Sequence, residues 1–153
     1  VRDVIGATQY QPKTKTPGGR ALEFYPSVRL SFSSPKEIKE TIKFAGKEIT
    51  RTIGVETQIK VFKNSVWKPY RSAPLVVNFS YGIDDISTCL QFIKDYTSNT
   101  VYCLREQKLS NDMEKAIKII EDSGTEKELK NEVIDLWEKI EAQFENERKP
   151  KYL

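Results

Sequence analysis

Alternation of apolar and polar residues predicts β-structure in the first half of the chain. Residues 28–33 alternate strictly and are typical of a half-buried strand. Residues 49–63 carry apolar side chains at most odd positions and polar ones between them, which predicts a long two-faced strand. Residues 75–81 carry apolar side chains at most positions, on both faces of the expected strand. This pattern predicts a central third strand. Short connections would make these three strands an antiparallel meander.

The segments around these strands show no such period. Residues 1–19 contain several Gly and Pro breakers and are interpreted as a loop. Residues 20–25 can form one or two helical turns, which Pro26 would stop. Residues 34–48 are rich in lysine and glutamate, with Ala45-Gly46 as a turn, and are interpreted as an exposed excursion.

Helical periodicity takes over after Gly82, which we expect to end the sheet. Asp84 or Asp85 can cap a helix whose apolar residues recur at i, i+3, i+4 and i+7 from Ile86. Residues 100–109 fit a short hairpin. A further helix is expected to follow it.

Two capping patterns define the last helices. Asn111 with Glu114 predicts a helix that Gly124 closes. Thr125 with Glu128 opens the next. Its apolar stripe consists of Leu129, Val133, Leu136, Trp137, Ile140 and Phe144. Such a stripe is typical of a core, so the last third is predicted to be a small α-rich domain.

Composition supports a soluble, foldable chain of 153 residues, with 38% hydrophobic and 31% charged residues. No apolar run approaches the roughly 20 residues of a membrane span, and no signal peptide is recognised, so a cytoplasmic location is expected. Residues 1–70 hold 13 Lys and Arg against 6 Asp and Glu, a net charge of +7, whereas residues 71–153 have a net charge of −4. The basic half is where an anionic partner would bind.

The chain contains no histidine, which excludes Ser-His-Asp triads and the usual zinc sites. Cys89 and Cys103 lack C-x-x-C spacing and are expected to be reduced thiols rather than a disulfide or metal site. No metal-binding residues are therefore predicted.

A basic, glycine-containing loop is the strongest candidate site. Its cations Arg2, Lys13 and Lys15 precede the pair Gly18-Gly19, where the backbone can approach a ligand closely. Such a loop, fixed to the strand at residue 28, suits a phosphate backbone. From composition alone, a disordered terminus is the alternative.

The segment from Gly18 to Leu30, Gly-Gly-Arg-Ala-Leu-Glu-Phe-Tyr-Pro-Ser-Val-Arg-Leu, closely resembles the G-G-x-A-L-x-F-Y-x-S-V-R-L block of RecA-type recombinases. Residues 55–64 resemble the family's G-x-E-T-x-V-K-V-V-K-N strand, and residues 69–71 and 81–82 resemble its P-F-[RK] and Y-G pieces. The resemblance runs from about Arg2 to about Ile86. It implies an α/β fold: the back half of a RecA-like core in residues 1–85, then a linking helix and small C-terminal domain in residues 86–153.

The resemblance also implies roles for particular residues. Residues 1–20 would correspond to the family's second DNA-binding loop, with contacts from Arg2, Ile5, Lys13, Lys15, Gly18 and Gly19. Lys63 would reach the γ-phosphate of ATP bound to the neighbouring subunit, whereas Ser65 replaces the second lysine of that motif. Phe24 would lie at the subunit interface, and Tyr81 with Gly82 beside the adenine. Ordinary core packing is the alternative for Phe24 and Tyr81, and a solvated strand edge for Lys63.

The implied function is that of part of a RecA-type recombinase: DNA-binding, ATP-dependent homologous recombination and DNA repair, with ATP and Mg²⁺ as cofactors. The implied partners are single- and double-stranded DNA and further subunits in a helical filament. No G-x-x-x-x-G-K-[ST] phosphate loop occurs in these 153 residues. The chain alone is therefore expected to bind no cofactor and to lack ATPase activity. The alternatives are a non-catalytic DNA-binding or filament-modulating protein and a remnant with no activity.

Overall fold

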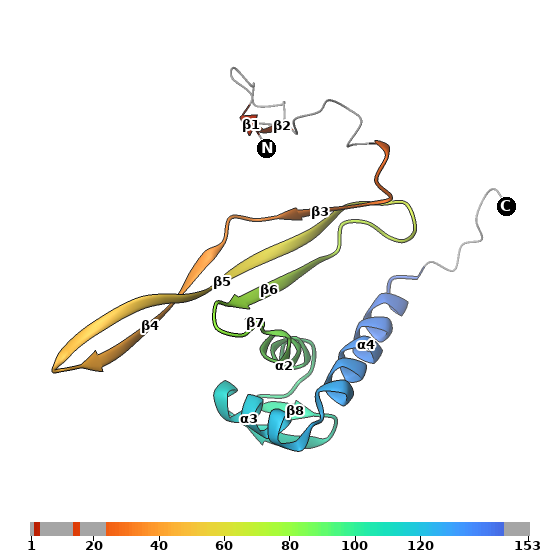
Figure 1. Ribbon diagram of the computed structural model, residues 1–153. Helices are drawn as coiled ribbons and strands as arrows, with labels where there is room; N and C mark the ends of the chain where they lie inside the picture. Colours follow the sequence, from red (N-terminus) through yellow and green to blue (C-terminus); the bar gives the residue numbers. More distant parts are fainter. Residues whose placement is uncertain (1, 4–13, 16–23, 146–153) are drawn as a thin grey trace, which may run out of the picture. The chain divides into compact units, whose positions relative to one another are not determined.

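The computed structural model describes residues 2–3, 14–15 and 24–145. By internal contacts the chain forms two compact units. The first unit consists of residues 1–34 and 57–73, and the second of residues 35–56 and 74–153. The described fold is α/β, with an antiparallel sheet and three described helices (Figure 1). The helical turn predicted for residues 20–25 lies almost wholly outside the described residues.

Strand pairing defines the first unit. A short ladder joins β1 (Arg2–Asp3) to β2 (Thr14–Lys15), so the predicted loop contains a two-residue β-ladder. Strand β3 (Val28–Phe32) pairs antiparallel with the last third of β5 (Lys47–Asn64). Both predicted strands are therefore confirmed, and β5 begins two residues earlier than the alternation indicated.

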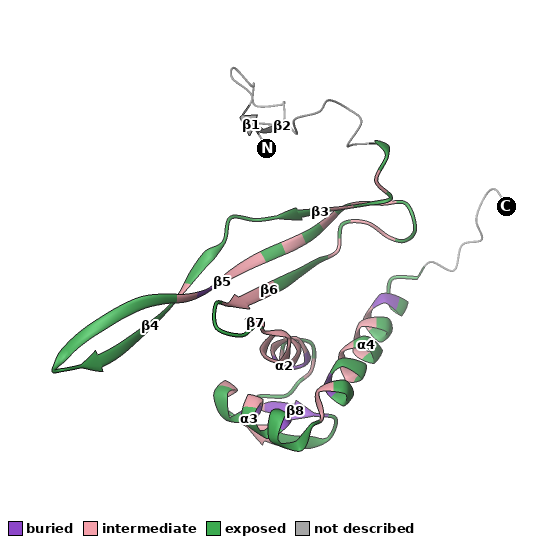
Figure 2. Cartoon of the chain, viewed as in Figure 1, coloured by how far each residue is buried: buried purple, intermediate pink, exposed green. Residues whose placement is uncertain are grey.

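Residues 36–56 form a hairpin in the second unit, and its outer part is exposed. The lysine- and glutamate-rich excursion is a nine-residue strand, β4 (Lys36–Phe44), paired antiparallel with the first half of β5 through the Ala45-Gly46 turn. The turn and the exposure were predicted, whereas the strand was not. Figure 2 shows the outer part of this hairpin as exposed on both strands. Its tip is held by pairing between strands rather than by a core.

The third predicted strand is β6 (Ser72–Asn78), which begins earlier and ends before Tyr81. It follows β5 in the sheet order β3-β5-β6-β7, which confirms the meander. The expectation that β6 is central is confirmed in part: β6 lies between β5 and β7 in the sheet order, but its described partner on the outer side is only the two-residue strand β7 (Gly82–Ile83). Gly82 therefore opens a last short strand rather than ending the sheet.

The first helix begins where the sequence predicts. Helix α2 (Asp85–Tyr96) is capped by Asp84, whose side-chain Oδ1 accepts a hydrogen bond of 3.0 Å from the Ser87 N–H. This contact satisfies one of the amides that have no partner inside the helix. The predicted hairpin follows as β8 (Tyr102–Leu104) and β9 (Gln107–Ser110).

The next helix, α3 (Met113–Ser123), begins one residue later than its capping pattern suggests. Asp112, not Asn111, is the N-cap, and its carboxylate accepts a hydrogen bond of 3.0 Å from the Glu114 N–H. A carboxylate also interacts favourably with the helix dipole at this end, which an amide cannot match. Gly124 ends the helix in the left-handed conformation, as predicted.

Helix α4 (Glu126–Ala142) carries the last apolar stripe. Thr125 is its N-cap residue but makes no side-chain capping bond; its hydroxyl pairs with that of Ser123 at 2.8 Å instead. Leu129 is buried, whereas Phe144 lies beyond the helix and is exposed, so the predicted stripe is too long at its C-terminal end.

The core of the second unit lies among these helices and the β8–β9 hairpin. Its buried residues are Leu90, Ile93, Tyr102, Leu104, Ala116, Ile120 and Leu129. Cys103 is buried and Cys89 half-buried, and the two are not joined by a disulfide. Within the described residues, none of the helices is long and apolar enough to span a membrane.

Candidate functional site

Two cationic residues occupy opposed positions near the end of the β3–β5 ladder. Arg29 of β3 lies directly opposite Lys63 of β5. Like charges at directly opposed positions destabilise a sheet. Each cation is held by a separate contact, described below, and a bound anion would offset their repulsion.

Lys63 is held by the start of the described chain. Its Nζ donates a hydrogen bond of 2.8 Å to the main-chain carbonyl of Phe24. Phe24 itself is 70% exposed, so its ring is not part of a core within the described residues. The segment that leads from residues 1–23 into β3 is thereby tied to the lysine predicted to contact a phosphate.

Arg29 was not predicted as a site residue. Its guanidinium carbon lies 5.1 Å from the centre of the Phe62 ring, within cation–π range. A shift of register after Arg29 leaves Phe62 without a partner in β3, so the ring can lie beside the arginine. The alternation of residues 28–33 marks Arg29 as a polar strand position, but nothing in the sequence gives the register that brings it to Lys63.

Ser65 follows the cationic pair and continues the strand connection. Its backbone N–H donates to the carbonyl of Ser27 at 2.9 Å, which extends the pairing beyond β5. The side-chain Oδ1 of Asn64 accepts hydrogen bonds from the N–H groups of Val66 (2.9 Å) and Trp67 (3.0 Å). This asparagine turn folds the connection back toward β6.

The structure describes two of the six predicted DNA-binding residues, Arg2 and Lys15. The β1–β2 ladder places the Cα atoms of Arg2 and Lys15 opposite each other, so two of the predicted cations belong to neighbouring strands. The other four, Ile5, Lys13, Gly18 and Gly19, lie outside the described residues.

Tyr81 and Gly82, predicted to lie beside an adenine, occur in the second unit. The Tyr81 hydroxyl donates to Asp84 Oδ2 at 3.2 Å, and its ring is 66% exposed. Partial burial, followed by the negative charge of Asp84, raises the pKa of Tyr81 above its usual value. Gly82 has a φ of +95°, a backbone conformation that favours glycine.

Tyr81 lines one side of a shallow, acidic pocket. It is lined by Tyr81, Ile83, Asp84, Asp85, Ile86, Ile117 and Glu121. Three carboxylates disfavour a phosphate there, whereas an aromatic ring between isoleucines suits an uncharged ring that donates hydrogen bonds. The chemistry of this pocket therefore differs from that of the Arg29–Lys63 pair.

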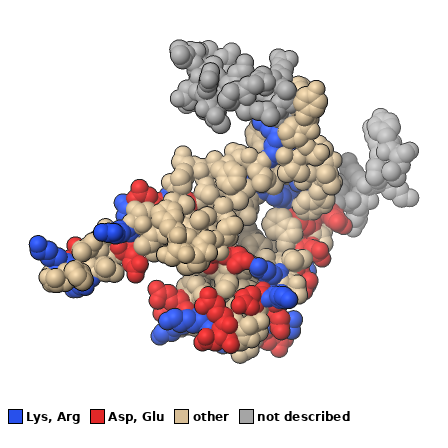
Figure 3. Space-filling model, viewed as in Figure 1, with Lys and Arg blue, Asp and Glu red and all other residues tan. Residues whose placement is uncertain are grey.

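Charge is divided between the two units. The residues of the first unit include nine Lys and Arg against two Asp and Glu, a net charge of +7, and those of the second have a net charge of −4. Figure 3 shows both signs mixed over the β4–β5 hairpin and over the helices. The cationic excess thus belongs to the unit that contains Arg29, Lys63 and the β1–β2 ladder.

The described features define an α/β protein with an antiparallel sheet and a cationic strand end. The model of the RecA N-terminal domain matches residues 1–84, more than half of the chain. Similar curated proteins include "Protein RecA" of Streptococcus sanguinis, 36% identical over 128 residues, and "Protein RecA" of Streptococcus pneumoniae, 33% identical over 124 residues. The chain belongs to the RecA family.

These matches cover 80% and 78% of this chain but only 32% and 31% of the two relatives. The chain therefore spans about a third of the length of the curated relatives it matches. The resemblance predicted from residues 18–30 is confirmed. The position of the boundary near residue 85, and the assignment of residues 1–85 to the back half of a RecA-like core, stay predictions.

Proposed function

We propose that this chain supplies the DNA-binding loop and a nucleotide contact of a RecA-type recombinase, which acts in DNA-binding, ATP-dependent homologous recombination and DNA repair. The observation that carries the proposal is the cationic strand end, where Arg29 lies opposite Lys63 in a unit of net charge +7. Family membership supports the same conclusion. Nothing in the described part of the chain favours the alternative of a non-catalytic, filament-modulating protein.

In this proposal residues 1–20 bind single- and double-stranded DNA through phosphate contacts. Arg2 and Lys15 lie on neighbouring strands of one ladder, so both can contact the same backbone. Lys13, Gly18, Gly19 and Ile5 would add further contacts. The location proposed with this role is the cytoplasm.

The DNA contact is tested by fluorescence anisotropy with a labelled oligonucleotide and the 153-residue chain. We expect affinity to fall steeply with salt, because neutralised phosphates release counterions. The triple variant Arg2→Ala, Lys13→Ala, Lys15→Ala should bind more weakly and with a flatter salt dependence. A matched control removes three lysines of the second unit: Lys115, Lys118 and Lys127. Equal losses in both triple variants would refute a loop-specific contact.

The second contact is to a nucleotide. Lys63 would contact the γ-phosphate of ATP, with its Mg²⁺, held by the adjoining subunit of a helical filament. Because Ser65 lacks a charge, Arg29, which lies opposite Lys63 in the ladder, is a candidate for the second cation. Phe24 would pack at the same subunit interface, and the adenine would lie beside Tyr81 and Gly82, where Tyr81 lines the shallow pocket.

Hydrolysis is tested in the complete protein, assembled on DNA with ATP and Mg²⁺. We expect Lys63→Ala to abolish DNA-stimulated turnover while DNA binding without nucleotide persists, and Ser65→Lys to raise turnover. Arg29→Ala should lower turnover, whereas Lys60→Ala, on the same strand, should not. Normal turnover in Lys63→Ala would mean that this lysine is only a strand-edge residue. The 153-residue chain by itself should neither bind nor hydrolyse ATP.

A further inference from the structure

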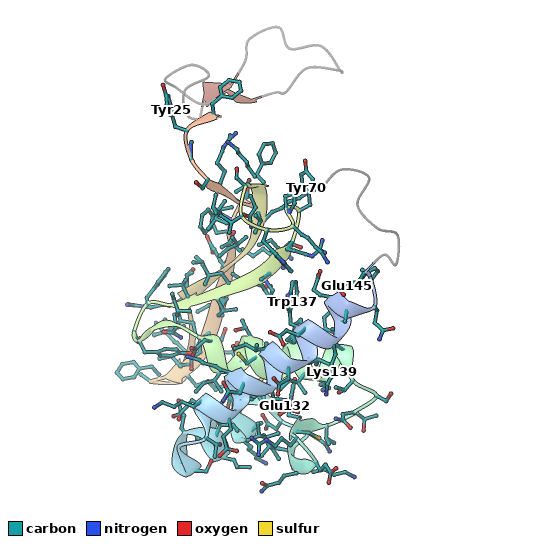
Figure 4. All side chains as sticks on the ribbon, turned by 90° about the vertical axis from the view of Figure 1, so that its right-hand side faces the viewer. Tyr25, Tyr70, Glu132, Trp137, Lys139 and Glu145 are labelled. Carbon is teal, nitrogen blue, oxygen red and sulfur yellow. The ribbon has the colours of Figure 1, made fainter. Side chains whose placement is uncertain are left out.

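The connection between β5 and β6 presents an aromatic and cationic surface in the first unit. Residues 65–71 read Ser-Val-Trp-Lys-Pro-Tyr-Arg. Trp67 is 49% exposed and Tyr70 67% exposed. Figure 4 shows the Tyr70 side chain at the end of this connection, directed away from the strands. We refer to Trp67, Lys68, Tyr70 and Arg71 as the aromatic loop.

Tyr70 occupies a backbone position that favours glycine. Its φ is +67°, in the left-handed region. The Tyr70 N–H donates to the Val61 carbonyl at 2.8 Å, and the Val61 N–H donates to the Arg71 carbonyl at 2.8 Å. Two residues therefore oppose one, which is a β-bulge of the type whose first position is usually glycine.

A tyrosine in this position is costly, and core packing does not repay the cost. A bulky side chain in the left-handed region is a conformational outlier, and most of this ring lies in solvent. Strained residues of this kind cluster at ligand contacts, where the surrounding structure holds them in place. The strain and the exposure together indicate that the ring serves an intermolecular contact.

Two cationic side chains of the aromatic loop lie beside the Trp67 ring. Lys68 Nζ lies 5.6 Å and the Arg71 guanidinium carbon 5.9 Å from the centre of its ring. Both are near the outer limit of cation–π attraction, so the cations lie beside the ring rather than tightly against it. The two hydrogen bonds that Asn64 Oδ1 accepts hold the backbone leading to Trp67. Aromatic rings and cations thus share one short, folded segment.

We propose that the aromatic loop is a binding site for single-stranded DNA, with a base stacked on Tyr70 and neighbouring phosphates paired with Lys68 and Arg71. Stacking on aromatic faces combined with backbone cations is how proteins bind single strands without sequence preference. The net charge of +7 on the first unit complements a polyanion and disfavours a cationic partner. The site is separate in sequence from the proposed loop at residues 1–20.

The test uses the tryptophan fluorescence of the 153-residue chain. Trp67 and Trp137 are its two tryptophans, so a Trp137→Phe background isolates the signal of Trp67. Titration with an oligothymidine should quench this emission, because a stacked or adjacent base changes the environment of the indole. Tyr70→Gly in the same background should weaken the binding about 10-fold, the loss expected for one stacking contact.

The substitution at Tyr70 separates binding from folding. Glycine is favoured at a φ of +67°, so Tyr70→Gly should leave the midpoint of thermal unfolding unchanged or raise it. Tyr70→Asn, which also tolerates this region, serves as a second variant. Phe144→Ala, which removes another exposed ring from the second unit, is the matched control and should bind normally.

Several results would overturn the proposal. One is quenching by ATP equal to that by the oligonucleotide at matched phosphate concentration, which would indicate a mononucleotide contact. Another is self-association of the chain that Tyr70→Gly abolishes, which would indicate a surface for a second copy. Unchanged oligonucleotide affinity in both Tyr70 variants would also overturn it. The Arg2, Lys13 and Lys15 variant distinguishes the two proposals, since its loss of binding does not depend on Tyr70.

Discussion

Lys63 and Phe24 are joined by a hydrogen bond of 2.8 Å between the lysine ammonium and a main-chain carbonyl. The bond links the end of β5 to the segment that precedes β3. A lysine that also contacts a phosphate would have to share its protons between two acceptors, which its three N–H donors allow. The position of Lys63 therefore connects the proposed nucleotide contact with the entry to the sheet.

The first prediction concerns this bond. Lys63→Met keeps the aliphatic stem and removes the donor, so the backbone of residues 24–27 should open more often. We expect faster amide hydrogen exchange there, with exchange in helix α2 unchanged. Lys63→Arg keeps a charged donor and should remain near the parent. Exchange at residues 24–27 that does not respond to Lys63→Met would show that pairing of β3 alone fixes this segment.

A second prediction concerns Gly54, a buried residue of β5. A Cβ atom there would lie 2.6 Å from the main-chain oxygen of Val77 in β6, closer than any real contact of this kind. Gly54→Ala should therefore force the strands apart and lower the free energy of unfolding by about 1–3 kcal/mol. Urea denaturation followed by circular dichroism measures this loss. The control Gln58→Ala, at an exposed position of β5, should change stability by less than about 0.5 kcal/mol.

A third prediction tests the cap of helix α3. Asp112→Ala removes the acceptor of the Glu114 N–H and should cost about 1 kcal/mol of stability. Asn111→Ala should cost much less, because Asn111 lies outside the helix and is not its cap. Thermal unfolding of the two variants gives the comparison directly. A larger loss of stability in Asn111→Ala than in Asp112→Ala would instead support Asn111 as the N-cap, as the sequence pattern predicted.

A fourth prediction concerns the titration of Tyr81. Because its pKa is raised in the folded chain, Tyr81 should ionise above the usual tyrosine pKa when absorbance at 295 nm is followed with pH. Asp84→Asn removes a negative charge that opposes ionisation and should shift that component to lower pH. Tyr81→Phe should remove it.

The raised pKa of Tyr81 also determines how folding stability changes with pH. Between the unfolded pKa near 10 and the higher folded value, the unfolded chain has lost the Tyr81 proton and the folded chain still holds it. Folding stability contributed by this group is thus complete below pH 10 and is lost as pH rises through that window. The dependence should be absent in Tyr81→Phe.

Local signals in the sequence predicted much of the fold. Gly124 was assigned correctly, and Asp84 was one of the two caps proposed for its helix, because a cap depends on a few adjacent residues and on backbone conformation. The strand of residues 36–44 was missed because it has only three large apolar residues, Ile38, Ile42 and Phe44, and because lysine and glutamate are depleted in strands. Its pairing with β5 overrides that weak preference.

Pairing register explains what could not be predicted at the site. Lys63 was identified from its motif, but Arg29 became a candidate only through its position opposite Lys63. That register includes an irregularity after Arg29, and no local pattern specifies where such a shift occurs. The conformation of Tyr70 could not be predicted either. A bulge of this type favours glycine at its first position, so a tyrosine in the sequence gives no signal of it.

The bulge at Tyr70 has a consequence for anyone who engineers this chain. Selection for expression level or heat resistance alone should replace Tyr70 by glycine or asparagine, because either relieves the backbone without touching a core residue. Such a variant would look like an improvement in every assay that omits an oligonucleotide. Laboratory evolution would therefore retain the aromatic ring only if the selection also required binding of single-stranded DNA.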